Sequence, residues 1–463
     1  SLDFYCTSHS QMIQEVEIKS FVFNDNNELK AAVNEWCDDE AAAREKYGDI
    51  NNWDVSNITN FSSIFSGKTE FNSDISNWDV SNGTVFNYMF NGASSFNQDI
   101  GNWDVSSATD LFQMFREASS FNQDIGDWDV GKVTCFTAMF QSAKAFNQDI
   151  GDWDVSNAQL IDWMFDWSTF NQDISEWDVG NVRDFSGVFA RNDDFNQDLS
   201  KWDVSNGISF SSMFDRATSF NQDLSNWNVS KGTNFWMMFW SAEEFNSDIS
   251  GWDVSNGTKF KDMFGRASSF NQDIGDWDVS NGTDFAGMFQ SSAFDQDISD
   301  WDVSSGEYFQ YMFNGNPEFS HQGIRKWKID YSDILTGMFS GATKFLDNGW
   351  QVSPTFEDFN FTIPTINGLD YESEASQLIL KGINLTGTAS ESNFGLSSLV
   401  ISNESGDLHT LQPEYVKQKT TKRLSGARGS GRFSGFIKED GSAVIFNNEG
   451  KSYVLEGDAV DIY

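Results

Sequence analysis

The sequence predicts an α/β solenoid of about twelve 25-residue strand-turn-helix repeats, preceded by an N-terminal helical cap and followed by a C-terminal all-β module. Two observations support this prediction. Tryptophan recurs at a nearly constant interval, and each interval contains one pattern typical of a strand and one typical of a helix. The chain of 463 residues divides accordingly into residues 1–50, 51–350 and 351–463.

The tryptophans define the repeat. They are Trp53, Trp78, Trp103, Trp128, Trp153, Trp177, Trp202, Trp227, Trp252, Trp277, Trp301 and Trp327, separated by 25 residues with single steps of 24 or 26. A single unit of this length cannot bury its own tryptophan and phenylalanines. We therefore expect stability to come from contacts between stacked neighbours.

The first half of each unit has the pattern of a half-buried strand. In the unit that begins at Trp78, apolar and polar residues alternate through Ser81. This alternation turns Trp78 and Val80 inward and Asp79 and Ser81 outward. Stacking such strands predicts one parallel sheet along the repeats.

The second half has the pattern of a short helix. Phe86, Met89, Phe90 and Ala93 fall at i, i+3, i+4 and i+7, which is one face of a helix, and Thr84 precedes them as a possible N-cap. Residues 96–99 then return the chain to the next strand. A layer of helices opposite the sheet is the result that we expect.

One string is close to a known repeat. Residues 96–106 read FNQDIGNWDVS, and this string resembles the 25-residue repeats of BspA-like leucine-rich-repeat surface proteins, including mycoplasma-type surface lipoproteins. The resemblance covers about residues 50–350. It implies a leucine-rich-repeat-like solenoid whose return-loop asparagines bond the backbone of the next coil. It also implies a surface-exposed or secreted binding or adhesion protein, although the chain shows no lipobox.

The flanks lack the repeat. Residues 27–46 read as a helix with Leu29, Val33 and Trp36 on one face, which suits a cap over the open end of the repeats. In residues 351–463, alternating runs at 377–383, 398–401, 443–446 and 452–455 predict strands separated by Gly, Asn and Ser. We expect one all-β module there, or two small ones.

Charge excludes some partners. The chain carries 29 Lys and Arg against 70 Asp and Glu, a net charge of −41. Residues 351–463 contribute −6 of this, so −35 lies in residues 1–350. This field repels nucleic acid and anionic membranes. The sequence contains no run of 18 apolar residues, which is about the length that a membrane-spanning helix needs.

The repeats place Asp residues in one outward column. The column contains Asp79, Asp104, Asp129, Asp154, Asp178, Asp203, Asp253 and Asp278. Neighbouring carboxylates about 5 Å apart would repel by roughly 3 kcal/mol at an effective dielectric of about 20. Three interpretations stay open: a hydrogen-bonded Asp/Ser ladder, bound cations such as Ca²⁺, or a concave ligand-binding face. No other cofactor is expected, and a resident metal is not identified.

Some aromatic residues fall outside the core pattern. They are Tyr88, Trp163, Trp167, Trp236, Trp240 and Tyr311. We expect them to project from the helical face and to bind a partner, because exposed aromatics mark contact surfaces. The alternative is that they pack against a return loop or a neighbouring helix.

The C-terminal module holds a basic cluster of Lys417, Lys419, Lys422, Arg423, Arg428 and Arg432. Interleaved glycines indicate a flexible loop. Such a loop is either simply solvated, or it makes an electrostatic contact with an acidic partner, including the repeats of another copy.

These features favour binding over catalysis. Paired carboxylates occur throughout the repeats, and no Ser/His/Asp or Cys/His order stands out, so no single active site is indicated. We expect a non-enzymatic protein that is extracellular or on a cell or virion surface, with a protein or glycan on a surface, or further copies of itself, as partner. The alternative is a structural component of a viral or phage fibre or surface assembly, docked through the β module.

Overall fold

The computed structural model describes residues 21–329, 334–347, 349–354 and 359, and nine short strands between residues 371 and 455. The chain forms two compact units. Unit 1 comprises Ser1–Gly323 and Thr336–Ser353, and unit 2 comprises Ile324–Leu335 and Pro354–Tyr463. Among the described residues, no helix has the length and apolarity that crossing a bilayer requires.

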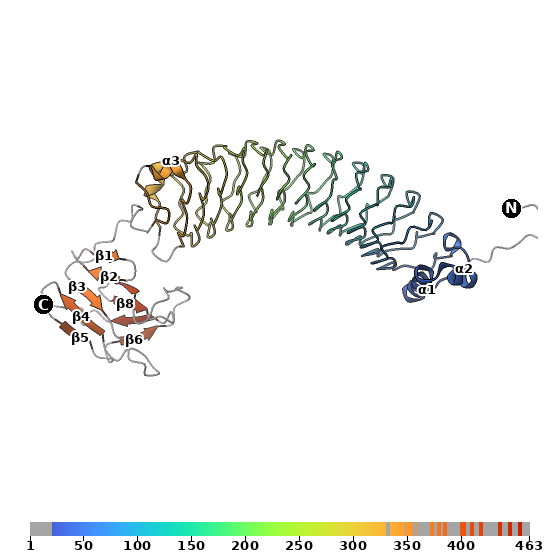
Figure 1. Cartoon of the computed structure of the whole chain (residues 1–463), viewed down its shortest axis with the longest axis horizontal. Coiled ribbons are helices and arrows are strands. Elements are labelled where there is room, and N and C mark those ends of the chain that lie inside the picture. Colours follow the sequence, from blue (N-terminus) through green and yellow to red (C-terminus); the bar gives the residue numbers. More distant parts are fainter. Residues whose placement is uncertain are drawn as a thin grey trace, which may run out of the picture. The chain divides into compact units, whose positions relative to one another are not determined.

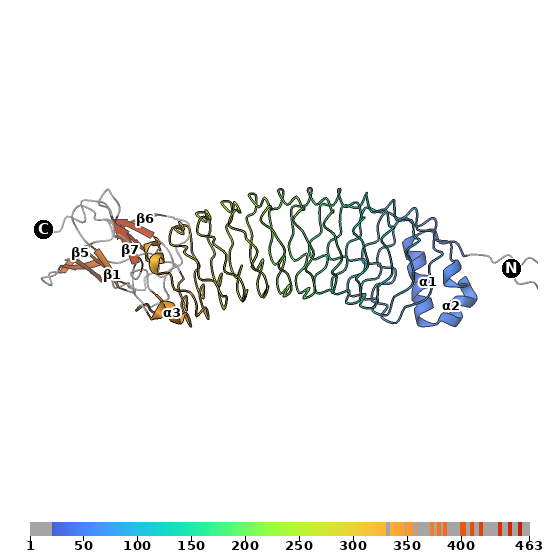
Figure 2. The ribbon, with the colours of Figure 1, turned by 90° about the horizontal axis from the view of Figure 1, so that it is seen from above.

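Two helices begin the described part of unit 1, at the blue end of the row in Figures 1 and 2. They are α1 (Asn26–Asp38) and α2 (Glu40–Tyr47), where the sequence pattern indicates one continuous helix. The break falls at Asp39, because its side chain accepts the Ala42 N–H and so caps α2. Leu29, Val33 and Trp36 of α1 are buried, as the pattern predicts.

The chain before α1 covers the open edge of the first coil. The Asp54 N–H donates to the Phe21 carbonyl, and the Phe23 N–H donates to the Asp54 carbonyl, both at 2.9 Å. The 3-10 helix η1 (Ile50–Asn52) leads into this coil. An edge that would otherwise offer unpaired backbone groups is therefore closed by the chain itself.

The repeats are stacked coils made of turns, so the predicted α/β solenoid is wrong. Residues 53–321 contain neither an α-helix nor a strand longer than isolated bridged residues. One parallel bridge links each coil to the next, as in Val85 with Asp110 and Asp110 with Cys135. Figures 1 and 2 show these coils side by side in single file, from blue to yellow.

The expected helix at residues 86–93 is a run of three overlapping four-residue turns. The N–H groups of residues 89, 91 and 93 donate to the carbonyls of residues 86, 88 and 90, at 3.0–3.1 Å. Those of residues 86, 88, 90 and 92 donate instead to carbonyls of the next coil, at 2.7–3.0 Å. Tyr88 and Gly92 are left-handed, with φ of 59° and 70°. A left-handed residue at every fourth position prevents a continuous helix.

The spacing of the coils explains this outcome. Packed helices need about 8–10 Å between their axes, whereas hydrogen-bonded coils lie about 4.8 Å apart. Backbone bonds between coils run through the turns as well as at the bridges, and the rings of Phe90 and Phe115 stack at 5.4 Å. A helix in each coil would separate the coils and break these bonds. Thr84, expected as a helix cap, donates its hydroxyl to Thr59 of the preceding coil.

The inward and outward pattern of the tryptophan segment is correct even though it forms no strand. Trp78 and Val80 are buried and Asp79 is exposed. The Trp78 indole N–H donates to the Ile50 carbonyl at 2.8 Å, and each later column tryptophan up to Trp301 repeats this bond one coil on. The core is therefore a set of stacked Trp and Phe columns, fixed in register by indole hydrogen bonds.

The return loops form the asparagine ladder that the resemblance implies. Oδ1 of Asn97 accepts the backbone N–H of Asn122 at 2.9 Å, and the Gln123 amide donates to the same oxygen. This contact recurs along the coils from Asn72 to Asn271. The expected bond from asparagine to the next coil is confirmed.

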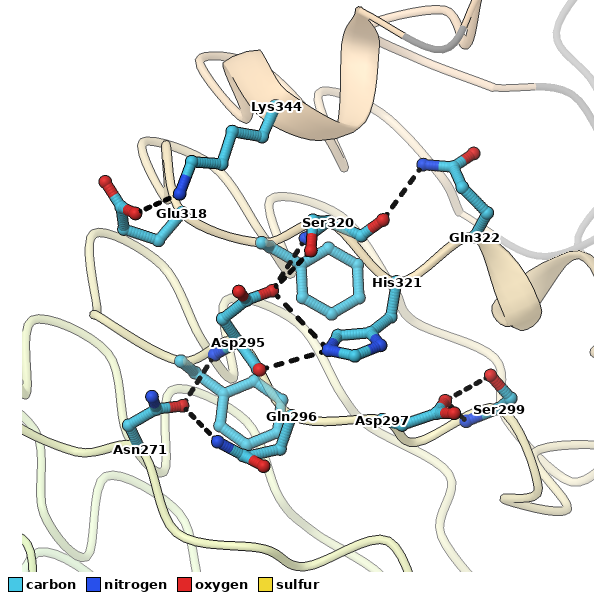
Figure 3. A network of polar contacts seen from close by, with 12 residues as sticks. Asn271, Asp295, Gln296, Asp297, Ser299, Glu318, Ser320, His321, Gln322 and Lys344 are labelled. Atoms are coloured by element: carbon cyan, nitrogen blue, oxygen red, sulfur yellow. Dashed lines mark hydrogen bonds and ion pairs between the residues drawn. The ribbon is translucent and has the colours of Figure 1, made fainter.

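The ladder changes residues at its last steps, as Figure 3 shows. Asp295 takes the asparagine position, and its carboxylate accepts the N–H and the hydroxyl of Ser320, both at 2.9 Å. His321 takes the glutamine position, and its Nε2 lies 3.1 Å from the Asp295 carbonyl. Lys344 of α3 (Thr343–Leu346) pairs with Glu318 beside this network.

Two coils are one residue shorter than the others, and at each of them a serine and an asparagine hydrogen-bond the backbone near the deletion. In the coil from Trp153, Ser168 stands where the preceding coils have Ala, and its hydroxyl donates to the Phe165 carbonyl at 2.8 Å. The next coil supplies the fully buried Asn192, whose amide donates to the Phe170 carbonyl at 2.8 Å. Ser292 and Asn316 repeat this pair at the second short coil. The polar pair satisfies backbone groups that the deletion exposes.

Unit 2 contains the 3-10 residues at the end of η2 (Gln322–Lys326) and two antiparallel sheets. The first has the order β1 (Tyr371–Glu374), β2 (Gln377–Leu380), β3 (Ile383–Thr386), β4 (Leu399–Asn403) and β5 (Leu408–Leu411). The second has the order β6 (Val416–Lys419), β9 (Ser452–Leu455), β8 (Ala443–Phe446) and β7 (Ser434–Ile437). Strands β8 and β9 coincide with two of the alternating runs in the sequence.

Candidate binding surface

One side of every coil is formed by residues 84–95 and their equivalents, and we call it the turn face. All six aromatic residues selected from the sequence lie on it, although not on helices as expected. Trp167, Tyr311, Trp236 and Tyr88 are 53%, 46%, 42% and 38% exposed. Trp163 and Trp240 are half-buried. The prediction that these residues lie outside the core is therefore correct for four of them and only partly correct for the other two.

The half-buried rings lie over glycines of the next coil. A Cβ atom at Gly187 would collide with the Trp163 ring, and one at Gly265 would lie 2.8 Å from Cδ1 of Trp240. Tyr311, although more exposed, has the same relation to Gly337, at 2.8 Å from Cε1. In each pair the glycine leaves the space that the ring fills. One side of each of these rings therefore packs against the next coil, which is close to the alternative that the sequence left open.

Cations from adjacent coils flank the two tryptophans that the sequence pattern places four residues after Trp163 and Trp236. Lys144 Nζ lies 4.5 Å from the centre of the Trp167 ring, and the Arg191 guanidinium lies 5.7 Å from it. Around Trp240, the guanidinium groups of Arg216 and Arg266 lie at 4.7 and 5.2 Å. Each indole is held by one cation from the preceding coil and one from the following coil.

These four cations were not identified from the sequence. Their signal was present, because Arg191, Arg216 and Arg266 occupy the position equivalent to Trp167 in later coils. Reading that position down the coils places Trp and Arg in one column. The contacts themselves depend on the close spacing of the coils, which the predicted helices obscured.

A charged ladder supports the middle of the turn face. Arg116 donates to Gln141, and Gln141 donates to Asp166 at 2.8 Å. Arg191 then binds the Asp166 carboxylate with two hydrogen bonds, at 2.9 and 2.6 Å. Asp166 is 1% exposed, so Arg191 neutralises a buried charge and its own orientation is fixed.

Asp215 follows this ladder without completing it. Its Oδ1 is buried and has no hydrogen-bond partner among the described residues, and the nearest cation, Nε of Arg216, is 3.9 Å away. Burial raises the pKa of Asp215 to about 6, although Arg216 and Arg191 oppose the shift. Burial likewise raises the pKa of Asp162 and Asp262 on this face.

The outward Asp column forms repeated local turns. All eight predicted members are exposed, and Oδ1 of each accepts the backbone N–H two residues later at 3.0–3.1 Å. At Asp79 the Ser81 hydroxyl also donates, at 2.6 Å. Serine hydrogen bonds lower the pKa of Asp104, Asp154, Asp203 and Asp253, so these carboxylates are not relieved by binding a proton. Among the described residues, no three acidic, His or Cys side chains are grouped as a metal site.

The basic cluster is only partly described. Lys417 and Lys419 lie in β6, where they are paired with Val454 and Ser452 of β9, so this end of the cluster is a strand and not a flexible loop. Lys422, Arg423, Arg428 and Arg432 lie outside the described residues.

These features define a class: a repeat protein of stacked, turn-rich coils with an aromatic turn face and an exposed column of aspartates. Family comparison then places the chain. It belongs to the family described as "Mycoplasma protein of unknown function, DUF285", whose model matches residues 38–153, 103–182, 134–252, 225–321 and 251–352. The finer assignment to BspA-like leucine-rich repeats is not confirmed. No curated protein and no solved structure shows a significant match.

Proposed function

We propose that the protein is a surface-exposed repeat protein that holds a partner on its turn face and acts by binding, without catalysis. One observation carries this proposal. Every large hydrophobic side chain that is exposed between residues 53 and 323 lies on the turn face: Tyr88, Leu160, Trp167, Ile208, Trp236, Tyr308 and Tyr311. Exposed apolar groups gathered on one face are characteristic of interaction sites.

The outward Asp column also favours binding over catalysis. Its aspartates are occupied by repeated local hydrogen bonds, and each coil presents the same arrangement, so no carboxylate pair is distinguished as an acid and a base. The family match and the sequence resemblance both favour a surface location. The exposed aspartates of the column would also keep a long array of repeats in solution, because like charges oppose association between molecules.

A cell-binding assay tests the proposal. Fluorescently labelled protein is incubated with intact animal, algal and bacterial cells, and bound fluorescence is measured against concentration. We expect saturable binding to at least one cell type and a loss of at least tenfold in a Trp167→Ser/Trp236→Ser variant. A Val22→Ser/Val352→Ser variant is the matched control, since these side chains lie outside the turn face and are 43% and 47% exposed. Absence of binding to all cells, or equal binding by both variants, contradicts the proposal.

A further inference from the structure

We propose that the turn face binds one extended strand of a neutral polysaccharide that runs along the row of coils. This inference rests on the binding function proposed above and names the ligand class. It follows from the spacing of the exposed rings, their posture, their unpartnered hydrogen-bond donors and the charge around them.

The exposed rings recur at every third coil. Tyr88 belongs to the coil that begins at Trp78, Trp163 and Trp167 to the coil from Trp153, Trp236 to that from Trp227, and Tyr311 to that from Trp301. Three coils at about 4.8 Å each separate successive aromatic groups by roughly 15 Å. A regular interval along the row of coils fits a linear polymer with its own translational repeat, and it does not fit a compact ligand.

The posture of the rings suits sugar binding. Trp163 and Tyr311 cover glycines of the next coil on one side, and both side chains remain partly exposed to solvent. Tyr88, Trp163 and Tyr311 also have left-handed backbones, with φ of 58–60°. Residues other than glycine cost about 1–2 kcal/mol in this region, and the other coils place Ser, Gln, Ala, Gly, Met or Asp at the same left-handed position. Three of the four coils with exposed rings thus hold an aromatic residue at this strained position, and flat apolar platforms are what the C–H faces of sugar rings contact.

Unpartnered donors are concentrated on the same rings. The column tryptophans from Trp53 to Trp301 donate their indole N–H groups to backbone carbonyls. In the described part of the chain, the indole N–H groups of Trp163, Trp167, Trp236 and Trp240 have no such bond. A platform edged with available N–H donors is suited to sugar hydroxyls, which accept hydrogen bonds.

The distribution of charge on the protein favours a neutral polymer over an anionic one. Nine of the twelve Lys and Arg residues between positions 53 and 323 lie on the turn face, and only Lys132, Lys201 and Lys231 lie elsewhere. Three of these cations have an acidic partner, since Arg116 pairs with Glu117, Arg191 is bound to Asp166 and Arg216 lies beside Asp215. The net charge of −35 in residues 1–350 repels a polyanion. Four of the turn-face cations flank the indoles of Trp167 and Trp240, so we assign them to the aromatic platforms and not to a site for an anionic chain.

Affinity electrophoresis tests the proposal. The full chain is run in native gels containing hydroxyethylcellulose, galactomannan or dextran, with dextran sulfate as the polyanion. The strong negative charge gives rapid migration, so retardation is easily measured. We expect retardation by at least one neutral polymer. A Trp167→Ser/Trp236→Ser/Tyr311→Ser variant should show at least fivefold weaker retardation, and a Val22→Ser/Val352→Ser control, at exposed residues outside the turn face, should remain within twofold of the parent.

Other results overturn the inference. Retardation by dextran sulfate alone shows a polyanion site, and retardation by none of the polymers excludes the proposed ligand class. If cells still bind the protein in that case, the binding function stands while the polysaccharide fails. Circular dichroism checks that each variant folds. If the triple variant does not fold, Trp167→Ser alone, at the most exposed of these rings, must still weaken retardation at least twofold.

Discussion

The contact between Trp163 and Gly187 makes a quantitative prediction about stability. Gly187 has φ of 63°, and the Trp163 ring fills the space where a side chain would be. Gly92 has a similar φ of 70°, but the nearest atom to a Cβ there is Cα of Gly67 at 3.7 Å. Replacing each glycine by alanine therefore separates the cost of the left-handed backbone from the cost of displacing a ring.

The two costs can be estimated. Gly92→Ala should lower the free energy of unfolding by about 1 kcal/mol, the penalty for a Cβ in the left-handed region. Gly187→Ala should lower it by the same amount plus about 1–3 kcal/mol for overpacking against Trp163. In a Trp163→Ser/Gly187→Ala double variant the second cost disappears. The two changes should thus be non-additive by about 1–3 kcal/mol, the overpacking cost that the double variant removes.

Urea unfolding followed by circular dichroism measures these differences. Midpoints are compared only among variants with equal slopes, because repeat arrays can lose two-state behaviour. If Gly187→Ala is no more destabilising than Gly92→Ala, the ring does not occupy that space. The assignment of Trp163 as a platform supported by the next coil would then be incorrect.

Three further predictions concern charges and the ladder. The pKa of Asp215 is raised to about 6, above its usual 3.8. Stability from this group is present below about pH 4 and is lost toward pH 6, by about 3 kcal/mol. Urea unfolding of Asp215→Asn should lack this loss, and an unchanged pH profile would refute the assignment. Asn147→Ala removes the acceptor of the Asn171 N–H, 2.8 Å away, and should lower the free energy of unfolding by about 1 kcal/mol; no change would show that the ladder is not stabilising. The melting temperature should be equal in EDTA and in Ca²⁺, because hydrogen bonds already occupy the Asp column; a fall in EDTA that Ca²⁺ reverses would show bound cations.

The period and the burial pattern were readable from the sequence. The interval of 25 residues predicted stacked units, and the alternation from Trp78 to Ser81 predicted correctly which side chains are buried. Both follow from the tendency of apolar side chains to leave water, which does not depend on the backbone conformation. The same reasoning identified Leu29, Val33 and Trp36 as the buried face of the cap.

The backbone of the turn face could not be read in the same way. Apolar residues at 86, 89, 90 and 93 fit one helical face and fit a run of overlapping four-residue turns equally well. Eight residues are too few to separate a period of 3.6 from a period of 4. The deciding factor is the spacing between coils, which is a property of the stack and not of one unit.

The candidate surface was found in part for a related reason. Aromatic residues outside the core columns are visible in one aligned position, so Tyr88, Trp163 and Tyr311 could be selected. The glycine that follows an aromatic residue one coil later is equally visible, and it is the signal that was missed. The cations that flank Trp167 and Trp240 come from coils on either side, so only the stacked structure brings them together.

Footprinting of the turn face tests the central claim most directly. Hydroxyl-radical oxidation rates of individual side chains are measured by mass spectrometry with and without saturating hydroxyethylcellulose. The account predicts that oxidation of Trp167, Trp236 and Tyr311 falls at least threefold together, while the exposed Val22 and Val352 are unaffected. Unchanged oxidation of all three rings, or equal protection of the two valines, would contradict it.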